Sequence, residues 1–382
     1  MKQIFIISSN FYDIANSKFT IGGIQTYIKD LCIAINRNGH EASLVQFGEY
    51  KMESEQISDD CRIIFYPRKK KLLQTADQYT FDCFYKSNNK NDSLFIIDTD
   101  QRDIKSKADN VVQIQHGITF DIPGNMIPGF FGKFVFFQRV NKLIRCRRNA
   151  SRLFHVRKTV CVDYNYYNWF RTQDTIPNDR DVKVIPNYSG SFISIDELES
   201  KLRDNCHPTK IVFARRFVEY RGTRLMIEAV KKVLSNHNNI EVTFAGSGPL
   251  SGEIESAFHG DNRVIITRYD SNESVSFHYK FDIAVVPTIF SEGTSLSLCE
   301  AMAAGCIPVA SCVGGMSNIL LNGYNGLMIH PNEEELATAL ETVIAMPHEQ
   351  KAQIAKRAYD TAVVSFSKQR WERQWLNFLN IK

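Results

Sequence analysis

Short apolar runs alternate with stretches of helical periodicity along the whole chain. An apolar run at residues 4–7 precedes a helical pattern over residues 24–36, which Gly39 closes, and a second apolar run follows at residues 42–47. Two buried strands joined by a helix are typical of parallel sheets. Further strands of this half are expected at residues 62–66, 94–97, 111–114, 159–162 and 182–185. We therefore predict an α/β domain built on a parallel sheet.

The second half repeats this alternation. Its apolar runs predict a second parallel sheet, with strands at residues 210–213, 241–245, 264–266, 283–286 and 307–310. Turn residues between Pro186 and Pro208 separate the halves, and Trp371, Trp375 and Phe378 recur at helical spacing near the end. That spacing predicts an amphipathic helix docked on protein. We expect an N-terminal domain over residues 1–190, a second domain over residues 191–365 and a terminal helix within residues 366–382.

Composition changes this picture little. The chain has 382 residues, 43% of them hydrophobic, which is enough for two cores. Its 46 basic and 42 acidic residues give a formal charge of +4, which provides no argument for a nucleic-acid partner. Nine cysteines without CxxC pairs argue against a disulfide framework or a structural zinc site and fit a reducing cytosol. Residues 301–332 carry no Asp, Glu, Lys or Arg, but Pro308 and several glycines interrupt them, so we predict no membrane span.

The strongest candidate for chemistry is the stretch at residues 285–316. Glu292 and Glu300 lie on either side of a predicted helix start at Gly293, which would let a ligand approach the backbone. The next backbone N–H groups would lie at the positive end of the helix, where a diphosphate fits. Those groups belong to Thr294, Ser295 and Leu296. Taken singly, each glutamate is more often an ordinary helix charge, but the combination favours a nucleotide site in which Glu300 meets ribose hydroxyls.

This stretch resembles the Glu-x7-Glu signature of retaining glycosyltransferases of the GT-B fold, glycosyltransferase family four. The family usually has Phe and Gly where this chain has Thr294 and Ser295, and backbone donation survives that change. The resemblance implies an α/β, GT-B architecture: two Rossmann-like parallel-sheet domains facing across a cleft, with a C-terminal helix crossing back to the first. It also implies that the second domain holds most of a nucleoside-diphosphate sugar and that the first offers the acceptor.

Two arginines follow the strand predicted at residues 210–213. Guanidinium groups bind phosphate through paired N–H groups and stay charged, so Arg216 and Arg221 could offset charge on a leaving diphosphate; the alternative is that they are surface charges. The segment resembles the family's G-R-L-x-x-x-K-G pattern, in which Arg216 takes the Arg position and Arg221 the Lys position. Arg215 replaces the family's Gly. Because neighbours on a strand face opposite ways, only one of Arg215 and Arg216 can face the cleft, and we expect Arg216 to do so.

Two features of the first half match the same family. Gly22 and Gly23 precede a predicted helix, and they resemble the family's loop that closes over the donor diphosphate; otherwise they form an ordinary turn. His116 follows the strand at residues 111–114, so its imidazole is expected at the carboxyl edge of the sheet. It matches the family's histidine near the transferred sugar, which is credited with orienting a sugar hydroxyl. Its other interpretation is structural.

No metal or other cofactor is expected beyond the nucleotide-sugar co-substrate. Asp98, Thr99 and Asp100 imitate the DxD metal motif of the other large glycosyltransferase fold, but they follow a first-half strand in a chain whose second half carries the GT-B pattern. The turn at residues 246–249 resembles the family's G-x-G-P turn, and residues 267–269 fall where the base would pack.

Residues 136–152 predict a basic amphipathic helix. An apolar sector about 120° wide lies opposite a basic sector, and only Arg147 intrudes on the apolar one. The apolar positions are Phe136, Phe137, Val140, Leu143 and Ile144, and the basic ones are Arg139, Lys142, Arg145, Arg148 and Arg152. Such a helix either lies on anionic lipid or docks on the core with its basic face in water. The sequence leaves both open.

These features together predict a retaining glycosyltransferase that moves a sugar from a nucleoside-diphosphate sugar to a glycan or lipid-linked acceptor in surface polysaccharide synthesis. It would act in the cytoplasm, with a peripheral contact to the anionic inner face of the membrane. The predicted catalytic residues are His116, Glu292, Arg216 and Arg221. The predicted donor-binding residues are Gly22, Gly23, Arg216, Arg221, Gly293, Thr294, Ser295, Leu296 and Glu300. Two alternatives stay open: a sugar-nucleotide epimerase of similar fold, and an inactive GT-B partner that scaffolds a glycan assembly complex.

Overall fold

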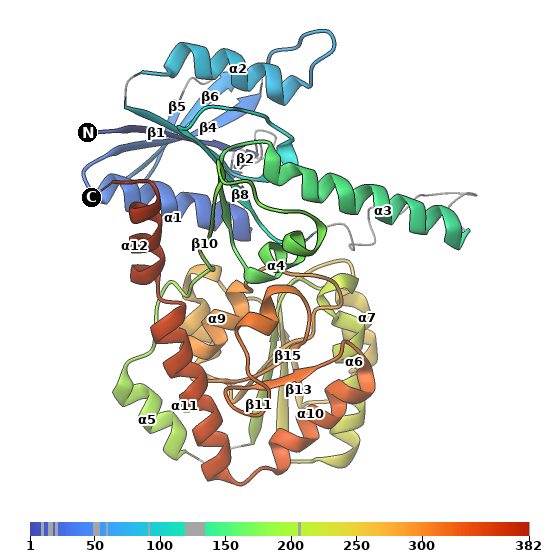
Figure 1. Ribbon diagram of the computed structural model, residues 1–382. Helices are drawn as coiled ribbons and strands as arrows, with labels where there is room; N and C mark the ends of the chain where they lie inside the picture. Colours follow the sequence, from blue (N-terminus) through green and yellow to red (C-terminus); the bar gives the residue numbers. More distant parts are fainter. Residues whose placement is uncertain are drawn as a thin grey trace. The chain divides into compact units, whose positions relative to one another are not determined.

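The computed structural model describes residues 1–8, 11–13, 18–19, 22–48, 54–58, 60–90, 92–118, 134–204 and 208–381. The chain forms two compact units. Unit 1 comprises Met1–His116, Ile127–Ile185 and Glu372–Lys382, and unit 2 comprises Gly117–Met126 and Pro186–Trp371. Figure 1 follows the chain from one end to the other by colour.

Unit 1 is built on an eight-stranded sheet in the order β10-β9-β8-β7-β1-β4-β6-β5. The parallel strands are β1 (Gln3–Ser8), β4 (Glu41–Gly48), β6 (Cys61–Pro67), β7 (Ser93–Ile97), β8 (Val111–Gln115), β9 (Lys158–Cys161) and β10 (Asp181–Val184). The edge strand β5 (Ser54–Ser58), which the apolar runs did not predict, runs antiparallel to β6. Only residues 59 and 60 separate the two strands, and a connection this short joins antiparallel neighbours. A further antiparallel pair is formed by β2 (Tyr12–Asp13) and β3 (Lys18–Phe19).

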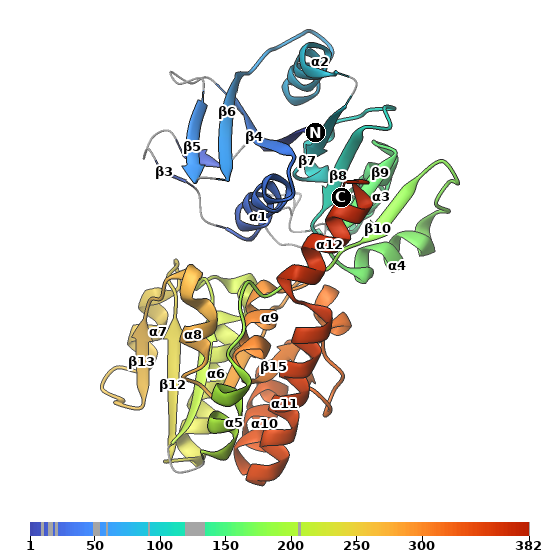
Figure 2. The same ribbon diagram turned by 90° about the vertical axis from the view of Figure 1, so that its left-hand side faces the viewer.

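Helices cover both faces of this sheet. Figure 2 shows α1 (Gly23–Arg37) and α2 (Ala76–Asn88) on opposite sides of it. The face under α2 is a cluster of aromatic rings, because α2 packs Phe81 and Phe84 against Phe5 and Phe95. Two more helices of the unit are α3 (Val135–Ser151) and α4 (Tyr164–Gln173). Burial on both sides explains why these strands read as continuous apolar runs.

The end of the chain belongs to unit 1. Helix α12 (Lys368–Phe378) buries Trp371 and Trp375, and the chain joins unit 1 from Glu372 onward. The indole Nε1 of Trp375 donates a hydrogen bond of 2.7 Å to the hydroxyl of Tyr27 on α1. The prediction of a terminal amphipathic helix docked on protein is therefore confirmed, and the two tryptophans are the reason.

Unit 2 is built on a six-stranded parallel sheet in the order β13-β12-β11-β14-β15-β16. Its strands are β11 (Thr209–Ala214), β12 (Ile240–Ala245), β13 (Val264–Thr267), β14 (Ile283–Val286), β15 (Ile307–Ser311) and β16 (Leu327–Ile329). The first five match the predicted runs, and β16 is too short to stand out as an apolar run. Successive side chains of β11 enter different cores, since Ile211 and Phe213 lie on one face and Val212 and Ala214 on the other.

Two sets of helices cover these faces. The core that contains Ile211 also draws on α6 (Thr223–Asn236), α7 (Ser251–Ala257) and α10 (Glu333–Ala345). The core that contains Val212 draws on α5 (Ile195–Arg203), α8 (Ser274–His278), α9 (Leu296–Ala303) and α11 (His348–Ser365). Unit 2 is thus a doubly wound α/β layer structure, the arrangement that places ligand loops at the carboxyl ends of the strands. None of the described helices has both the length and the apolar character needed to cross a membrane.

Candidate donor site

Four side chains converge where β11 and β14 end. Arg215 follows β11, Arg221 ends the next 3₁₀ turn (Glu219–Arg221), and Thr288 and Glu292 follow β14. The Arg215 Nη2 lies 2.7 Å from Glu292 Oε1 and 3.0 Å from Oε2, and the Arg221 Nη1 lies 2.6 Å from Oε1. The Thr288 hydroxyl donates to Glu292 Oε2 at 2.6 Å and accepts from Arg215 Nη1 at 2.6 Å. One carboxylate therefore holds two guanidinium groups in place.

Two glycines allow the backbone to bring these residues together. Gly222 follows Arg221 with a φ of +80°, and a Cβ there would lie 1.9 Å from the carbonyl oxygen of Pro287. Gly314 has a φ of +53°, and a Cβ there would lie 2.1 Å from the carbonyl oxygen of Glu292. The neighbouring amide of Gly315 donates to that same oxygen at 2.7 Å. Only glycine permits such close approach in the left-handed region, so the Glu292 backbone is fixed from two sides.

The cluster has a net positive charge, because two guanidinium groups share one carboxylate, and its two cations differ in exposure. Burial alone would raise the pKa of Glu292, but the guanidinium groups of Arg215 and Arg221 and the Thr288 hydroxyl outweigh it and lower the pKa to about 2. The Arg215 side chain is 5% exposed, whereas that of Arg221 is 28% exposed and lies over the ring of Tyr220. Glu292 is an anion at any physiological pH, and Arg221 is the cation that solvent can reach.

The structure corrects the choice between the two adjacent arginines. Arg215, not Arg216, turns toward Glu292, and Arg216 is exposed. The amide of Arg215 still continues the sheet by donating to Ala245, while the next ring, Phe217, enters the core with Phe213. Arg221 also contacts Glu292. Of the predicted pair, Arg221 therefore lies at the Glu292 site and Arg216 does not.

The helix after Glu292 begins later than expected. The prediction placed its start at Gly293, but α9 begins at Leu296, and Ser295 is its N-cap without a side-chain capping bond. Thr294 and Ser295 are buried, and the Asn187 side chain donates to the Thr294 carbonyl at 2.5 Å. The backbone N–H groups of the first turn of α9 have no acceptor within the helix, as at every helix start. The anion-binding end therefore lies two to three residues further along than predicted.

Glu300 occupies a different environment from Glu292. It lies on α9, and the Ser274 hydroxyl of α8 donates to its Oε2 at 2.7 Å. Burial raises the pKa of Glu300, and the Ser274 hydrogen bond opposes this only in part. Next to it, Tyr269 stacks on Phe277 with ring centroids 4.5 Å apart, and burial followed by the Glu300 charge raises the pKa of Tyr269 to about 12. A carboxyl group beside a flat aromatic pair can meet a ribose and a base.

The predicted residues did not include Thr288, Ser274 or Phe277 of these clusters. Thr288 stands at the end of the β14 strand, four positions before Glu292, so its place in the sequence was a usable signal. Ser274 lies 26 positions before Glu300 on a separate helix, and nothing in the local pattern connects the two. The contact arises only from the packing of α8 on α9.

The predicted residues of unit 1 gather at the carboxyl edge of its own sheet. The His116 ring follows β8, and its Nε2 lies 2.8 Å from the Asp98 carbonyl oxygen, which can only accept. Nε2 therefore carries the proton, and Nδ1 keeps its lone pair. Burial lowers the pKa of His116, and the Asp98 carbonyl opposes this. The ring packs edge-on against Tyr27 at 5.6 Å, on the same helix whose N-cap is Gly22 and whose first residue is Gly23.

The two carboxylates of the DxD-like segment lie in different environments. Asp98 forms a two-point ion pair with Arg102, at 2.6 and 2.9 Å, and the Arg102 side chain is 6% exposed. Asp100 is buried, and burial raises its pKa to about 7. Among the described residues, no three His, Cys, Asp or Glu side chains are grouped as a metal site would need.

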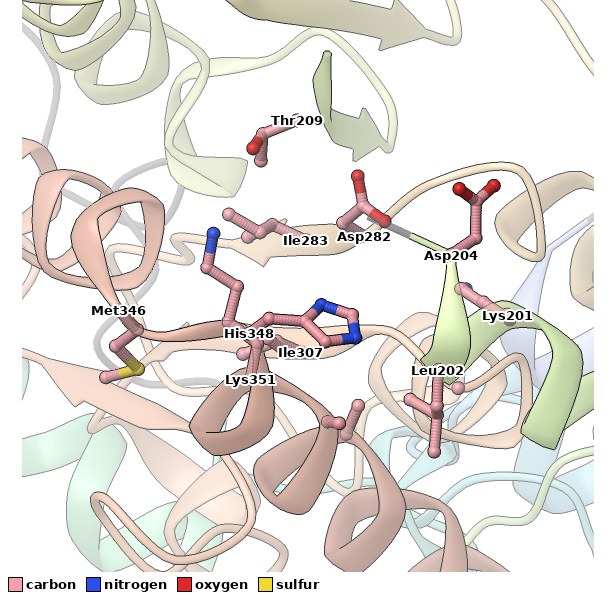
Figure 3. A pocket seen from close by; sticks show the side chains of 13 residues that line it. Lys201, Leu202, Asp204, Thr209, Asp282, Ile283, Ile307, Met346, His348 and Lys351 are labelled. Carbon is pink, nitrogen blue, oxygen red and sulfur yellow. The ribbon is translucent and has the colours of Figure 1, made fainter. Parts of the chain in front are cut away.

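A pocket of about 340 Å³ lies at the opposite edge of the unit 2 sheet. Figure 3 shows Lys201, His348 and Lys351 around it, at the amino ends of β14 and β15. The Lys201 and Lys351 ammonium groups donate to the carbonyls of Ala304 and Ile344. These lysines are structural, and ligands of open α/β sheets bind at the other edge, so we place the candidate donor site at Glu292.

Comparison with known proteins finds similarity to glycosyltransferases. Residues 194–361 match the family described as "Glycosyl transferases group 1". A relative from Methanocaldococcus jannaschii, the uncharacterized glycosyltransferase MJ1607, is 29% identical over 140 residues, 35% of each chain. The lipopolysaccharide core biosynthesis glycosyltransferase LpsE of Rhizobium meliloti is 23% identical over 269 residues, 67% of this chain and 73% of LpsE. The solved structure of Anabaena HepE in complex with UDP-glucose aligns over 100% of both chains with a TM-score of 0.71 and 14% identity.

Proposed function

Because the chain belongs to the glycosyl transferases group 1 family and has the GT-B fold, we propose that it is a retaining glycosyltransferase. The match covers about a third of the length of the M. jannaschii relative, so the activity of the whole chain is our inference. The donor is a nucleoside-diphosphate sugar, and the acceptor is a glycan or a lipid-linked glycan. The observation that carries the proposal is the Glu292 carboxylate paired with Arg215 and Arg221 at the carboxyl edge of unit 2.

We assign the diphosphate to Arg215, Arg221 and the start of α9. Two fixed cations and the free N–H groups of a helix start together offset the charge that builds up on a departing diphosphate. Gly293, in the loop before the helix, has no side chain that would keep a ligand away from the backbone. Glu300 takes the ribose hydroxyls, with Tyr269 and Phe277 beside it for the base. The exposed Arg216 has no part in this assignment.

Glu292 holds the sugar hydroxyls in this proposal, and the hydrogen bonds of the cluster indicate how it becomes available. A carboxylate offers about four acceptor positions. In the structure Oε1 accepts from Arg215 and Arg221, and Oε2 accepts from Arg215 and Thr288. A diphosphate that draws the more exposed Arg221 toward itself would free Oε1 for a sugar hydroxyl. Binding of the donor phosphates and orientation of the sugar are then one coupled step.

The reaction course follows from these roles. The bond between the anomeric carbon and the diphosphate oxygen breaks, the acceptor hydroxyl attacks the same face, and a phosphate oxygen of the leaving group takes the hydroxyl proton. No enzyme nucleophile is needed, and Glu292 is kept as a charged hydrogen-bond acceptor by its low pKa. In unit 1, the unprotonated Nδ1 of His116 can accept from a sugar hydroxyl.

We also propose surface polysaccharide synthesis in the cytoplasm as the setting. The relative LpsE is a lipopolysaccharide core biosynthesis enzyme, which supports this choice of acceptor class. HepE is solved with UDP-glucose, which makes UDP-sugars the first donors to try.

The test is release of nucleoside diphosphate from UDP-, GDP- and ADP-sugars, with and without free or lipid-linked glycan acceptors. We expect release that depends on the acceptor, and loss of that release in Glu292→Ala with the fold retained by circular dichroism. Conversion of the donor into an isomeric sugar nucleotide without an acceptor, without net release of nucleoside diphosphate and followed by nuclear magnetic resonance, would identify an epimerase. Nucleotide binding without any turnover would identify an inactive scaffold partner, and full activity of Glu292→Ala would refute the site.

A further inference from the structure

Helix α3 in unit 1 presents its apolar side outward. Phe136, Leu143 and Ile144 are 69%, 64% and 62% exposed, and Val140 on the same side is 38% exposed. The less exposed side of the helix carries the polar residues Gln138, Asn141, Arg145 and Asn149 together with the small residues Cys146 and Ala150. This is the reverse of an ordinary surface helix, whose apolar stripe faces the core. Of the two arrangements that the sequence left open, the core-docked apolar face is therefore not the one observed, and Figure 1 shows α3 extending away from the sheet of unit 1.

Cations border this apolar stripe. Arg139 and Lys142 beside the stripe are exposed, as is Arg147, which lies within the stripe, and the helix contains no Asp or Glu. Arg148, also exposed, is paired with Asp103. An exposed apolar stripe bordered by positive charge is the pattern of a helix that lies in the headgroup region of an anionic membrane.

A second element of unit 1 has the same chemistry. Lys71 and Gln74 close a tight turn whose tip is Leu72 and Leu73, 86% and 100% exposed. Leu73 has a φ of +67°, a conformation that Gly or Asn adopts more readily than Leu. The turn follows Arg68, Lys69 and Lys70 in the sequence. The sequence pattern around residue 72 lacks the periodicity that drew attention to α3, so this turn becomes visible only in the structure.

We propose that unit 1 docks on an anionic lipid bilayer by inserting the outward stripe of α3 and the Leu72–Leu73 turn, with the bordering lysines and arginines on the headgroups. Two separate segments, each an apolar tip bordered by cations, match a surface that is apolar inside and negative at its rim. A second copy of the chain fits less well, because a two-fold contact places the same basic residues opposite each other. If the proposed transfer reaction holds, the contact brings the chain to the plane in which a lipid-linked acceptor lies.

This inference is independent of the proposed transfer reaction. The residues that carry it lie in unit 1, away in the sequence from Glu292, Arg215 and Arg221 of unit 2. A chain that binds vesicles without transferring sugar, or transfers sugar without binding vesicles, would refute one proposal and leave the other intact.

The test is co-sedimentation of the full chain with vesicles of phosphatidylglycerol and phosphatidylcholine, compared with phosphatidylcholine alone. We expect binding to the anionic vesicles that weakens as salt rises from about 0.1 to about 0.5 M, since screening shortens the reach of exposed charges. The triple variant Phe136→Ser, Leu143→Ser, Ile144→Ser should lose at least about tenfold in partitioning. The turn variant Leu72→Ser, Leu73→Asn and the charge variant Arg139→Gln, Lys142→Gln should each lose less.

A matched control uses exposed apolar residues of unit 2. Ile195 and Val364 are 54% and 69% exposed, and the double substitution to Ser should leave vesicle binding unchanged. Thermal melts by circular dichroism check that each variant is folded, which is expected because the changed side chains are exposed. Absence of binding to anionic vesicles, or equal binding to neutral ones, would overturn the proposal. So would a dimer in sedimentation velocity that the triple variant dissociates, because the stripe would then belong to a second copy.

Discussion

The two sheets carry buried carboxylates at their carboxyl edges, and they treat the negative charge differently. In unit 2, Glu292 is shared by two guanidinium groups, and its pKa falls to about 2. In unit 1, Asp98 has the Arg102 pair, but Asp100, two residues on, has an Oδ2 without a hydrogen-bond partner among the described residues. Burial raises the pKa of Asp100 to about 7. The number of fixed cations within reach therefore decides whether a buried carboxylate is a permanent anion or a group that titrates near neutrality.

The Glu292 and Asp100 environments suit different ligands. A permanent anion that fixes two cations is suited to an anionic ligand, because a diphosphate can exchange places with a carboxylate without a change of protonation. At the unit 1 edge, burial raises the pKa of Asp100 to about 7 and lowers the pKa of His116, so neither group is a fixed charge near neutral pH. We therefore propose that the ionic part of the reaction depends on the Glu292 cluster of unit 2.

The largest expected effect comes from removing the cation that pairs with Asp98. Arg102→Ala would leave Asp98 buried without a counterion, which we expect to lower the free energy of unfolding by about 3–5 kcal/mol. The measurement is urea unfolding at pH 7. The matched control is Arg157→Ala, because Arg157 and its partner Asp109 are 40% and 76% exposed; its effect should stay within about 0.5 kcal/mol. Equal effects of the two substitutions would contradict the distinction between buried and exposed pairs.

The next largest effect is the pH dependence of stability that arises from Asp100. Below about pH 4 the carboxyl is protonated in both the folded and the unfolded chain. Between about pH 4 and pH 7 the unfolded chain loses the proton while the folded chain keeps it, so stability falls as pH rises. Asp100→Asn should remove this slope and raise the free energy of unfolding at pH 8 by up to about 4 kcal/mol. Urea unfolding at a series of pH values measures it.

Asp103 is the control for this pH dependence, because its pKa is shifted in the opposite direction to that of Asp100. Burial alone would raise its pKa, but ion pairs with Arg152 and Arg148 outweigh it and lower the pKa. Its stabilising contribution is therefore present above its ordinary pKa and lost as pH falls, so Asp103→Asn should destabilise the protein at pH 7. Its backbone has a φ of +54°, which Asn tolerates, so the substitution tests charge and not conformation. A gain in stability at pH 7 would show that the contrast with Asp100 is false.

The two adjacent arginines provide a sharper test of the unit 2 edge. Arg215→Ala should lower acceptor-dependent turnover about 10²-fold or more, because it removes a buried cation proposed to stabilise the leaving diphosphate. Arg216→Ala changes an exposed neighbour of identical chemistry and should stay within about threefold of wild type. The measurement is nucleoside-diphosphate release under saturating donor. A loss in Arg216→Ala with Arg215→Ala active would restore the assignment favoured by the sequence.

The arginine pair also shows where sequence reasoning ends. Apolar runs located nearly every strand of both sheets, because strands buried on two faces leave a strong local signal. Period-two alternation says that Arg215 and Arg216 point opposite ways, but not which points inward. That choice depends on Phe217 entering the core after the strand has ended. The antiparallel β5, the late start of α9 and the Ser274 contact likewise depend on neighbours distant in the sequence.

The smallest expected effect is at Glu300. Its carboxyl accepts from Ser274, and Gln can keep that bond through its amide oxygen, so Glu300→Gln should fold normally. If Glu300 holds the ribose in both the bound donor and the transition state, the loss is one of uniform binding. We therefore expect the KM for donor to rise about tenfold with kcat within about twofold, in contrast to the turnover loss expected of Arg215→Ala. Ser274→Ala should shift the KM in the same direction by a smaller factor, because it frees the carboxyl without removing it. A fall in kcat in Glu300→Gln would mean that this carboxyl acts on the reacting sugar, and the division of roles between Glu292 and Glu300 would then have to be redrawn.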